Sequence, residues 1–497
     1  MTHANPVSEA PETAARAPAE PSVALAGEQL TADLCIIGAG SGGIALATMA
    51  ATFGRKVVLV EKQRMGGGGL AGSIPSKALV IAGRRAQAMR TASAFGIAAV
   101  EPQIDIRAVA GHVRSVISTV APNDSVERLT GLGVRVIHGS ARFLDKRTLL
   151  AGDYRVRARR FVVASGSSPA LPDIPGLEVC PHFTNETIFD ADRKIPHLLI
   201  IGAGPVGLEL AQAHHRLGSR VTVVDAGRAL GKDDPEAAAA VVRALRAEGI
   251  DIREDAKVER VEAIAGHVRA HLASTNGAET VEASHLLVAA GRVPNVSDLN
   301  LDAAGVRTSP HGIVVNDGLR TSNRRIYAIG DVTGSPRFSH VASHQAEIVL
   351  RRILFRLPAK FDPTLVPWVT FTDPELAHVG LSEDQARAAN MRIEVLRWPF
   401  TENDRAHAEH QTLGHVKIIT AKGRVAGATI VGPNAGELIQ IWSLAVAQKL
   451  HISALAGYVA PYPTLGEAGK RAALRHYAAL PARSIVRKLI NFLARLG

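Results

Sequence analysis

Two glycine-rich segments of this chain have the spacing that suits a dinucleotide pyrophosphate. In each, the first glycine permits a tight strand-to-helix turn, the second lets the backbone approach the anion, and the third lets the helix pack on the strand. The helix that follows would offer unpaired backbone N–H groups to the phosphates. The glycines, which recur at an offset of 164 residues, are Gly38, Gly40 and Gly43, then Gly202, Gly204 and Gly207.

An acidic residue stands 18 residues past the third glycine in each segment. Glu61 and Asp225 would end the second strand of each unit and accept hydrogen bonds from an adenosine ribose. A carboxylate repels a 2′-phosphate, so Asp225 favours NAD(H) over NADP(H). Arg220 and Arg228 flank Asp225 and offer a partner to such a phosphate, which leaves NADP(H) as the alternative.

Two strand–helix–strand units are needed to position these side chains. Apolar runs precede the glycines at Leu34–Ile37 and Leu198–Ile201, and Gly54 and Gly218 close the helical stretches that follow. The alternative is that both are ordinary strand–helix turns with a purely structural role and no ligand. Because both units repeat the whole pattern, we predict two Rossmann-like domains in a two-nucleotide redox enzyme.

The composition is that of a large globular protein. With 497 residues, of which 46% are hydrophobic and 21% charged, about three domains are expected. The formal net charge is +11, but the basic residues are scattered and only 4% of residues are aromatic, so we predict no nucleic-acid partner. A basic surface would instead attract anionic cofactors.

The two ends of the chain differ from its interior. Residues 1–30 are rich in Ala, Pro and Glu and predict a disordered tail. We find neither a signal-peptide pattern nor an uncharged apolar run of about 18 residues, so we expect a cytoplasmic protein. Residues 481–497 predict a short basic amphipathic helix, which packs on the protein itself or lies on a membrane surface.

The chain contains two cysteines. Cys35 lies in the first predicted strand and is expected to fill the core, whereas Cys180 lies in a Pro-rich stretch and is expected to be a loop thiol. Neither has a C-x-x-C partner or metal-ligand spacing. We therefore predict no metal site and no disulfide framework.

Further motifs follow one another in a specific order. They are GSIPSKAL (72–79), VVASGSSP (162–169), AAGRVPN (289–295), IYAIGDVTG (326–334), SHVASHQAE (339–347), VPWVTFTDPELAHVG (366–380) and PYPTLGE (461–467). From Ala32 to about Tyr477 the chain resembles the class I pyridine nucleotide-disulfide oxidoreductases, such as lipoamide dehydrogenase, glutathione reductase and mercuric reductase. The resemblance implies an α/β fold with two Rossmann-like nucleotide-binding domains, for FAD and NAD, a C-terminal α+β dimerisation domain, and a homodimer.

Domain boundaries follow from the same resemblance. The FAD-binding domain is expected in two parts, at residues 31–170 and 293–365, with the NAD(P)-binding domain between them at 171–292. The dimerisation domain would cover residues 366–480.

The resemblance also assigns cofactor contacts. FAD would bind the first fingerprint with Glu61, and the nicotinamide cofactor would bind the second with Asp225. Asp331 would hold the ribityl chain of the flavin, and the turn at Gly330 would let backbone reach the pyrophosphate. Gly291 would line the nicotinamide. Further residues assigned to cofactor binding are Gly166, Ala342 and Lys77.

The loop before Ile-Pro-Ser-Lys departs from the family. In the disulfide reductases it carries two cysteines that form a redox bridge beside the flavin. Here Ser73 replaces one, and Gly68 or Gly69 replaces the other, depending on a one-residue gap. A serine hydroxyl has no accessible redox couple, so we predict no dithiol chemistry. The glycines at 66–69 predict a roomier and more mobile site above the flavin.

A second departure lies near the C-terminus. Where lipoamide dehydrogenase and glutathione reductase have a histidine base, this chain has Tyr462, and the family's glutamate is retained as Glu467. A tyrosine hydroxyl with an ordinary pKa near ~10 donates a hydrogen bond rather than serving as a base at neutral pH. The thiol-handling base is therefore absent from this motif.

Lys77 and Glu209 match the lysine and glutamate that pair beside flavin N5 in the family. The alternative is a helix-surface salt bridge of little energetic value. A cation at this place would stabilise the anionic reduced flavin.

We therefore predict an FAD-dependent oxidoreductase that passes hydride from NADH to FAD and then to a small acceptor, such as a quinone, near Ser73. One alternative is a soluble pyridine nucleotide transhydrogenase, which has a hydroxyl residue in the same sequence context. The other is a redox-silent FAD-binding scaffold or sensor that lost catalysis with its cysteines.

Overall fold

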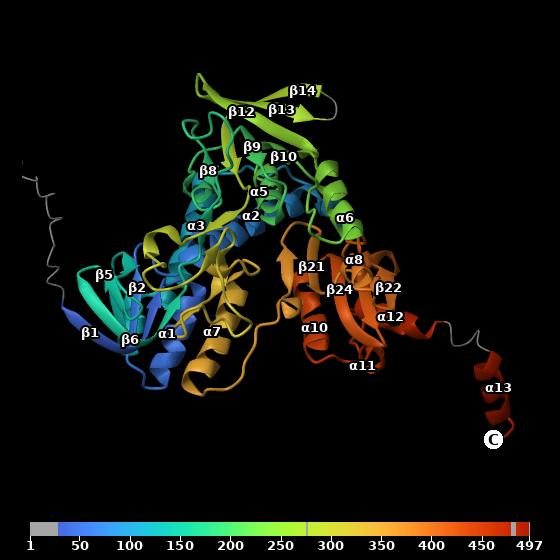
Figure 1. Ribbon diagram of the computed structural model, residues 1–497. Helices are drawn as coiled ribbons and strands as arrows, with labels where there is room; N and C mark the ends of the chain where they lie inside the picture. Colours follow the sequence, from blue (N-terminus) through green and yellow to red (C-terminus); the bar gives the residue numbers. More distant parts are fainter. Residues whose placement is uncertain (1–27, 275–276, 479–483, 497) are drawn as a thin grey trace, which may run out of the picture.

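The computed structural model describes residues 28–274, 277–478 and 484–496. Figure 1 shows three bodies: the blue and cyan N-terminal domain, completed by gold segments, the green domain above it, and the orange to red C-terminal domain beside it. Most of the predicted N-terminal tail lies outside the described residues. The tail was expected to end at residue 30, and the first strand begins at Gln29, where backbone pairing with a neighbouring strand starts.

The N-terminal domain is built on a sheet of order β3-β2-β1-β6-β5-β4, with β19 also paired to β6. The neighbouring strands β3, β2, β1, β6 and β19 pair in parallel, whereas β5 pairs antiparallel with both β6 and β4. Helices α1 and α7 pack together at this sheet. The bounds are β1 Gln29–Ile37, β2 Val57–Glu61, β3 Arg135–His138, β4 Ala141–Phe143, β5 Thr148–Ala151, β6 Tyr154–Val163, β19 Ile326–Ala328, α1 Ser41–Thr52 and α7 Ser339–Leu354.

The second domain contains a parallel sheet of order β11-β10-β9-β15-β8. An antiparallel sheet of order β12-β13-β14 lies at its outer end, and the short strands β7 and β16 pair where the chain passes between the two domains. The bounds are β7 Ser167–Pro169, β8 Phe183–Thr184, β9 His197–Ile201, α5 Pro205–Arg216, β10 Arg220–Val224, α6 Pro235–Ala247, β11 Asp251–Arg253, β12 Ala256–Ile264, β13 His267–Ser274, β14 Gly277–Ala283, β15 His285–Val288 and β16 Arg292–Pro294.

Helix α2 (Ile74–Arg90) joins the two nucleotide-binding domains. It packs against α5 of the second domain and against α3 (Ile106–Val120). Gly83 permits the close approach to α5, because a Cβ on this residue would lie 3.3 Å from the Ala213 Cα. The pairing brings Lys77 on α2 within reach of Glu209 on α5.

The C-terminal domain is an antiparallel sheet of order β20-β21-β24-β23-β22 covered by helices. Its core is apolar, with Phe400 and Trp442 buried. The bounds are β20 Trp368–Thr370, β21 Glu375–Gly380, α8 Glu383–Ala388, β22 Ile393–Pro399, α9 Asp404–Ala408, β23 His415–Ala421, β24 Arg424–Gly432, α10 Ala435–Ala447, α11 Ile452–Gly457 and α12 Glu467–Leu474.

The C-terminal domain is fixed to the second domain by a buried ion-pair cluster. The Lys417 ammonium lies 2.7 Å from Asp234 at the start of α6 and 2.9 Å from Glu383 at the start of α8. Lys417 and Asp234 are both nearly inaccessible to water, at 6% and 3% side-chain exposure. Because each charge is paired, the contact holds the two domains in register without leaving an isolated buried ion.

The last helix, α13 (Ser484–Leu493), stands apart from the C-terminal domain in Figure 1. It confirms a helix in the predicted segment, although residues 481–483 and 497 of that segment lie outside the described residues. Within the described ranges, no helix combines the length and apolarity needed to cross a bilayer.

Candidate functional site

The first glycine fingerprint forms the turn between β1 and α1. Gly38 has φ +106°, and a Cβ there would lie 2.3 Å from the carbonyl oxygen of Ala164, so no other residue fits. A Cβ on Gly43 would meet the Gly38 oxygen at 1.9 Å. Gly40 is the N-cap of α1, has no side-chain cap, and has open space where a Cβ would lie. The uncapped helix start therefore offers its N–H groups to an anion.

The second fingerprint repeats this geometry between β9 and α5. Gly202 has φ +111°, and a Cβ on Gly207 would meet the Gly202 oxygen at 2.0 Å. Gly204 is the N-cap of α5, again without a side-chain cap and with open space in place of a Cβ. Both cradles thus fit a pyrophosphate, and a side chain at Gly40 or Gly204 would occupy its place.

The two fingerprint acids are held at these turns. Oε2 of Glu61 accepts a hydrogen bond from the Ala39 N–H at 2.7 Å, and Oδ2 of Asp225 accepts one from the Ala203 N–H, also at 2.7 Å. The other oxygen of each carboxylate accepts from the backbone N–H two residues on, at 2.8 and 2.9 Å. The carboxylates are therefore oriented before any ribose binds, and each oxygen keeps acceptor capacity for a hydroxyl.

The residues expected around the flavin lie at the end of β19 and on α7. The Gly330 N–H donates to Oε1 of the buried Gln345 at 2.7 Å. Gly330 has φ +73°, and a Cβ there would lie 3.2 Å from the Cβ of Ala342, so these two positions pack closely. Asp331 accepts a hydrogen bond from the Ser167 hydroxyl at 2.6 Å, which fixes its carboxylate.

Arg292 joins this group and was not assigned a role from the sequence. Its Nε donates to the Ser167 hydroxyl at 2.7 Å, and its Nη2 donates to the Ser167 carbonyl and to Glu186 at 2.6 and 2.7 Å. The guanidinium also lies 3.9 Å from Asp331. Arg292 belongs to the Gly-Arg-x-Pro-Asn motif and could have been found there, but the prediction assigned a role only to the glycine of that motif.

Gly166 and Gly291 flank this arginine network. Both have positive φ, +67° and +113°, and both have open space where a Cβ would lie. The Gly166 carbonyl accepts from the Asn295 N–H, and the Gly291 carbonyl accepts from the Ala170 N–H. These bonds fix both glycines at the crossing between the two nucleotide-binding domains.

Lys77 and Glu209 meet across α2 and α5. Nζ of Lys77 lies 2.5 Å from Oε2 of Glu209, and Oε1 of Glu209 accepts from the Phe371 N–H at 2.9 Å. The Lys77 ammonium also lies 4.5 Å from the centre of the Phe371 ring. Glu209 is only 4% exposed, so the pair is not a surface salt bridge. Lys77 keeps 34% of its side chain exposed.

Only the second half of the glycine segment expected to be a loop is helical, because Gly66 and Gly67 have left-handed φ of +84° and +50°. The helix starts after Gly68, continues through the wider turn of Gly69–Ser73 and runs without a break into α2. A Cβ on Gly68 would have open space, which agrees with a roomy site. Ser73 is exposed, and its carbonyl accepts from the Ser76 hydroxyl at 3.0 Å. Ser73 lies one helical turn before Lys77.

Tyr462 and Glu467 belong to the C-terminal domain. The Tyr462 side chain is 70% exposed, and its hydroxyl donates to Asp404 at 3.1 Å. This carboxylate raises the pKa of Tyr462, which strengthens the argument against a neutral-pH base. Glu467 is the first residue of α12. The side-chain hydrogen bond of Tyr462 thus lies within its own domain, whereas Ser73 and Lys77 lie at the start of α2, the helix that joins the two nucleotide-binding domains.

Both cysteines are buried and free. Cys35 lies in β1 with no exposure, and burial raises its pKa. Cys180 lies in a loop, as expected, but it is only 2% exposed and packs in the core of the second domain. Its segment is irregular, but the surrounding apolar side chains cover it. Burial raises the pKa of Cys180 too, and neither thiol is placed for redox exchange.

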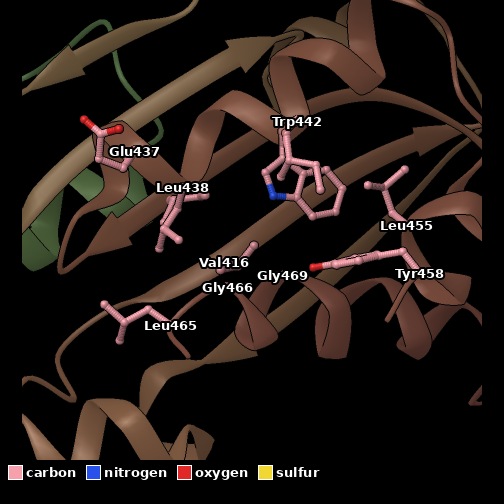
Figure 2. Close-up of a pocket in the computed structure, with 11 residues that line it drawn as sticks. Val416, Glu437, Leu438, Trp442, Leu455, Tyr458, Leu465, Gly466 and Gly469 are labelled. Atoms are coloured by element: carbon pink, nitrogen blue, oxygen red, sulfur yellow. The ribbon is translucent and has the colours of Figure 1, made fainter. Parts of the chain in front are cut away.

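A cavity of about 180 Å³ lies in the C-terminal domain, away from both fingerprints (Figure 2). Trp442 and Leu438 of α10 line it, together with Leu455, Tyr458 and Leu465. The lining is largely apolar and offers no glycine cradle for phosphate. The cavity is therefore not part of either nucleotide site.

Comparisons with known proteins agree with the geometry. Residues 32–346 match the family model described as pyridine nucleotide-disulphide oxidoreductase, and residues 366–473 match the dimerisation domain of that family. The chain is 36% identical to a mercuric reductase of Lysinibacillus sphaericus, over 89% of this chain and 82% of the relative. It is 32% identical to a dihydrolipoyl dehydrogenase of Geobacillus stearothermophilus, over 88% of this chain and 94% of the relative.

Solved structures show the same fold. LpdA of Mycobacterium tuberculosis superposes with a TM-score of 0.82 and 27% identity, covering 90% of this chain and 99% of that one. The HOCl-induced flavoprotein disulfide reductase RclA of Escherichia coli superposes with a TM-score of 0.79 and 26% identity, covering 89% of this chain and 99% of that one. With both fingerprints formed and both family models matched, the chain belongs to the pyridine nucleotide-disulfide oxidoreductase family, whose members bind FAD and a pyridine nucleotide.

Proposed function

We propose that this protein is a homodimeric FAD-dependent oxidoreductase that passes reducing equivalents from NADH to a small acceptor such as a quinone, without a cysteine disulfide relay. One observation carries the proposal. Lys77, one helical turn past Ser73, forms an ion pair with the buried Glu209, while residues 62–79 contain no cysteine. Reduction without a dithiol is the chemistry that this combination supports.

FAD, when bound, supplies the two-electron carrier between the nicotinamide and the acceptor. The chain's own contribution is electrostatic and positional. Glu209 fixes the Lys77 ammonium, which remains one-third exposed and so can face the redox centre. A fixed cation stabilises negative charge that develops beside it. At the crossing between the two nucleotide-binding domains, Arg292 donates to the Ser167 hydroxyl, which donates to Asp331 and so holds this carboxylate in one orientation.

The names of the relatives do not transfer directly to this chain. Binding of soft metal ions and exchange with disulfides both need accessible thiolates. The two thiols here are buried in β1 and in the core of the second domain. We therefore propose neither mercuric ion nor a disulfide as the acceptor. A planar small oxidant needs only access to the flavin, and the side-chain-free surface at Gly68 leaves room for it.

NADH is proposed as the reductant because of Asp225. Its carboxylate is fixed at the second glycine turn by the Ala203 and Gly227 N–H groups. In this position it accepts from a free ribose hydroxyl and repels a 2′-phosphate. Arg228 beside it is exposed and lies 3.7 Å from Asp255, so part of its charge is already engaged.

The proposal is tested by anaerobic titration of the purified flavoprotein with NADH. We expect complete bleaching of the flavin at one NADH per flavin, because no disulfide stores a second electron pair. Acceptors are then added singly, and the return of the oxidised spectrum is timed. Uptake of two equivalents per flavin, or fast reoxidation by lipoamide but not by quinones, would overturn the proposal.

The same preparation separates the two alternatives. A transhydrogenase would reoxidise rapidly when NADP⁺ is added and would need both nicotinamide cofactors for turnover. A redox-silent scaffold would bind FAD but fail to bleach with NADH at any concentration that saturates the second fingerprint.

A further inference from the structure

Helix α13 presents an apolar face that the other described residues leave largely uncovered. Five of its large apolar side chains, and Leu496 just past its end, are more than half exposed, whereas Val486 is partly buried. They follow the spacing i, i+4, i+7 and i+11 from Ile485, with two more beside them, so they form one broad stripe on the helix. The members of this apolar stripe are Ile485, Leu489, Ile490, Phe492, Leu493 and Leu496.

The opposite face of α13 is basic. At 100° per residue, Lys488, Arg495 and Arg487 project on the side away from the apolar stripe, together with Ser484 and Asn491. We call this the basic face. The charge bias extends beyond the helix, because residues 468–497 contain seven Lys and Arg residues and no Asp or Glu. A partner for this segment must therefore accept apolar side chains and supply negative charge.

Length narrows the choice of partner. An isolated helix of ten residues is marginal in water, so α13 needs a surface to be stable. It spans roughly 15 Å, about half the hydrocarbon thickness of a bilayer, and so cannot cross one. A second copy of α13 would bring the same basic residues together without any acid to pair them. An anionic lipid surface satisfies both faces at once, with the stripe at the acyl boundary and the basic face among headgroups.

We propose that α13 is an interfacial anchor that binds the protein to the surface of bilayers containing anionic phospholipid. The inference goes beyond the redox function and does not depend on the identity of the acceptor. It places the C-terminal domain next to the lipid, because α13 follows that domain in the chain.

Flotation with vesicles tests the proposal on the full-length holoprotein. The probes are vesicles of phosphatidylcholine alone and vesicles containing phosphatidylglycerol as well. We expect binding to the anionic vesicles only, and loss of that binding at high salt because surface charges are screened. Equal binding to neutral vesicles, or no binding to anionic vesicles in large lipid excess, would overturn the proposal.

Variants assign the binding to the two faces of α13. Lys488→Gln with Arg495→Gln removes two charges and should weaken partitioning about 30-fold, since each basic residue near such a surface contributes about fivefold. Leu489→Ser with Phe492→Ser should weaken it by at least about tenfold through lost apolar burial. Asn491→Gln, on the polar face, is the matched control and should bind like the wild type.

Packing of α13 on protein would give a different result. The main rival surface is the apolar cavity lined by Trp442 and Tyr458 (Figure 2), and another is the partner subunit. In either case Leu489→Ser with Phe492→Ser would lower the melting temperature or shift the oligomeric state without any lipid. We expect unchanged melting and unchanged oligomeric state. A lower melting temperature or a changed oligomeric state in this variant would contradict the anchor and favour packing of α13 on protein.

Discussion

The Lys77 ammonium lies 2.5 Å from the Glu209 carboxylate and 4.5 Å from the centre of the Phe371 ring. Three segments from three domains meet in this contact, α2, α5 and the strand end after β20. Glu209 is nearly fully buried and has its second oxygen bonded to the Phe371 N–H. The carboxylate therefore has little freedom, and the ammonium is held by it in one place.

The first prediction is that Lys77→Met slows flavin reduction by about 10–100-fold, because the cation that stabilises developing negative charge is lost. Nucleotide binding should change little, since the fingerprint glycines and Asp225 provide it. Stopped-flow flavin bleaching over a range of NADH concentrations separates the limiting rate from the affinity. A loss confined to affinity would contradict this role.

Stability distinguishes the chemical effect from a structural one. Lys77→Met leaves the buried Glu209 without its cation and should lower the free energy of unfolding by about 1–3 kcal/mol, less than for a fully buried pair because Lys77 is one-third exposed. Adding Glu209→Gln should restore much of that stability. The flavin reduction rate should stay low in the double variant, and its recovery would mean that Lys77 acts only through folding.

Sequence reasoning located the nucleotide turns because their requirement is local. The positive φ of Gly38 and Gly202 belongs to the turn itself, and the crowding at Gly43 and Gly207 comes from Gly38 and Gly202 of the same βαβ unit, although Ala164 and Ala289 at the ends of later strands also crowd the two turns. The acid at the end of each second strand follows from the same unit, since parallel pairing brings β2 beside β1 and β10 beside β9. A repeated local constraint of this kind is visible in the residues alone.

The missed features depend on contacts between distant segments. Phe371 donates to Glu209 from 162 positions along the chain, and Arg292 reaches Ser167 from 125 positions away. No periodicity records such pairs. The burial of Cys180 was not foreseen for the same reason, because packing from other strands covers its irregular segment. The helix through the glycine segment follows from its continuity with α2, which offsets the low helical propensity of glycine.

A second prediction concerns nicotinamide selectivity. Asp225→Ala should narrow the preference for NADH over NADPH by about tenfold or more, because repulsion of the 2′-phosphate is removed. The structure adds that NADH affinity itself should fall, since Asp225 also holds the Ala203 and Gly227 N–H groups. Asp225→Asn is the matched control, which keeps one acceptor oxygen but removes the charge. Dissociation constants for both nucleotides give the ratio, and an NADPH preference in the wild type would refute the carboxylate argument.

A third prediction links the interdomain cluster to pH. Hydrogen bonds from Lys417 and Arg387 lower the pKa of Glu383 from 4.5 to about 2 in the folded protein. A carboxylate with a lowered folded pKa stabilises the fold above its ordinary pKa, and this contribution is lost as pH falls from about 4.5 toward about 2. Glu383→Gln should therefore be less stable than wild type at pH 7 by about 1–3 kcal/mol, and the gap should close at acidic pH.

Denaturant unfolding of both proteins at several pH values between pH 7 and the acid limit of folding measures this gap. Glu409→Gln serves as the control, because its i, i+4 pair with the half-exposed Arg405 should contribute less than about 0.5 kcal/mol at any pH. A gap between Glu383→Gln and wild type that stays constant with pH would show that the charge of Glu383 is not what stabilises the cluster.

The last prediction concerns the missing cysteines. Gly68→Cys with Ser73→Cys should fold, because Gly68 has helical φ of −61° and open space for a side chain. It should nevertheless show no lipoamide reductase activity. The prediction holds whether or not the two thiols reach the Cβ separation of about 3.5–4.5 Å that a disulfide needs across the wider turn Gly69–Ser73. Even a formed bridge would lack a base, since Tyr462 donates to Asp404 and its pKa is raised.

Ser73→Ala is the companion variant on the acceptor side. It should retain quinone turnover within about threefold of the wild type, because a hydroxyl with no redox couple is not needed for transfer from the flavin. NADH-dependent turnover with a quinone and with lipoamide is measured for both variants and the wild type at equal flavin content. Loss of quinone turnover in Ser73→Ala, or brisk lipoamide turnover in the wild type, would exclude the cysteine-free route from flavin to acceptor.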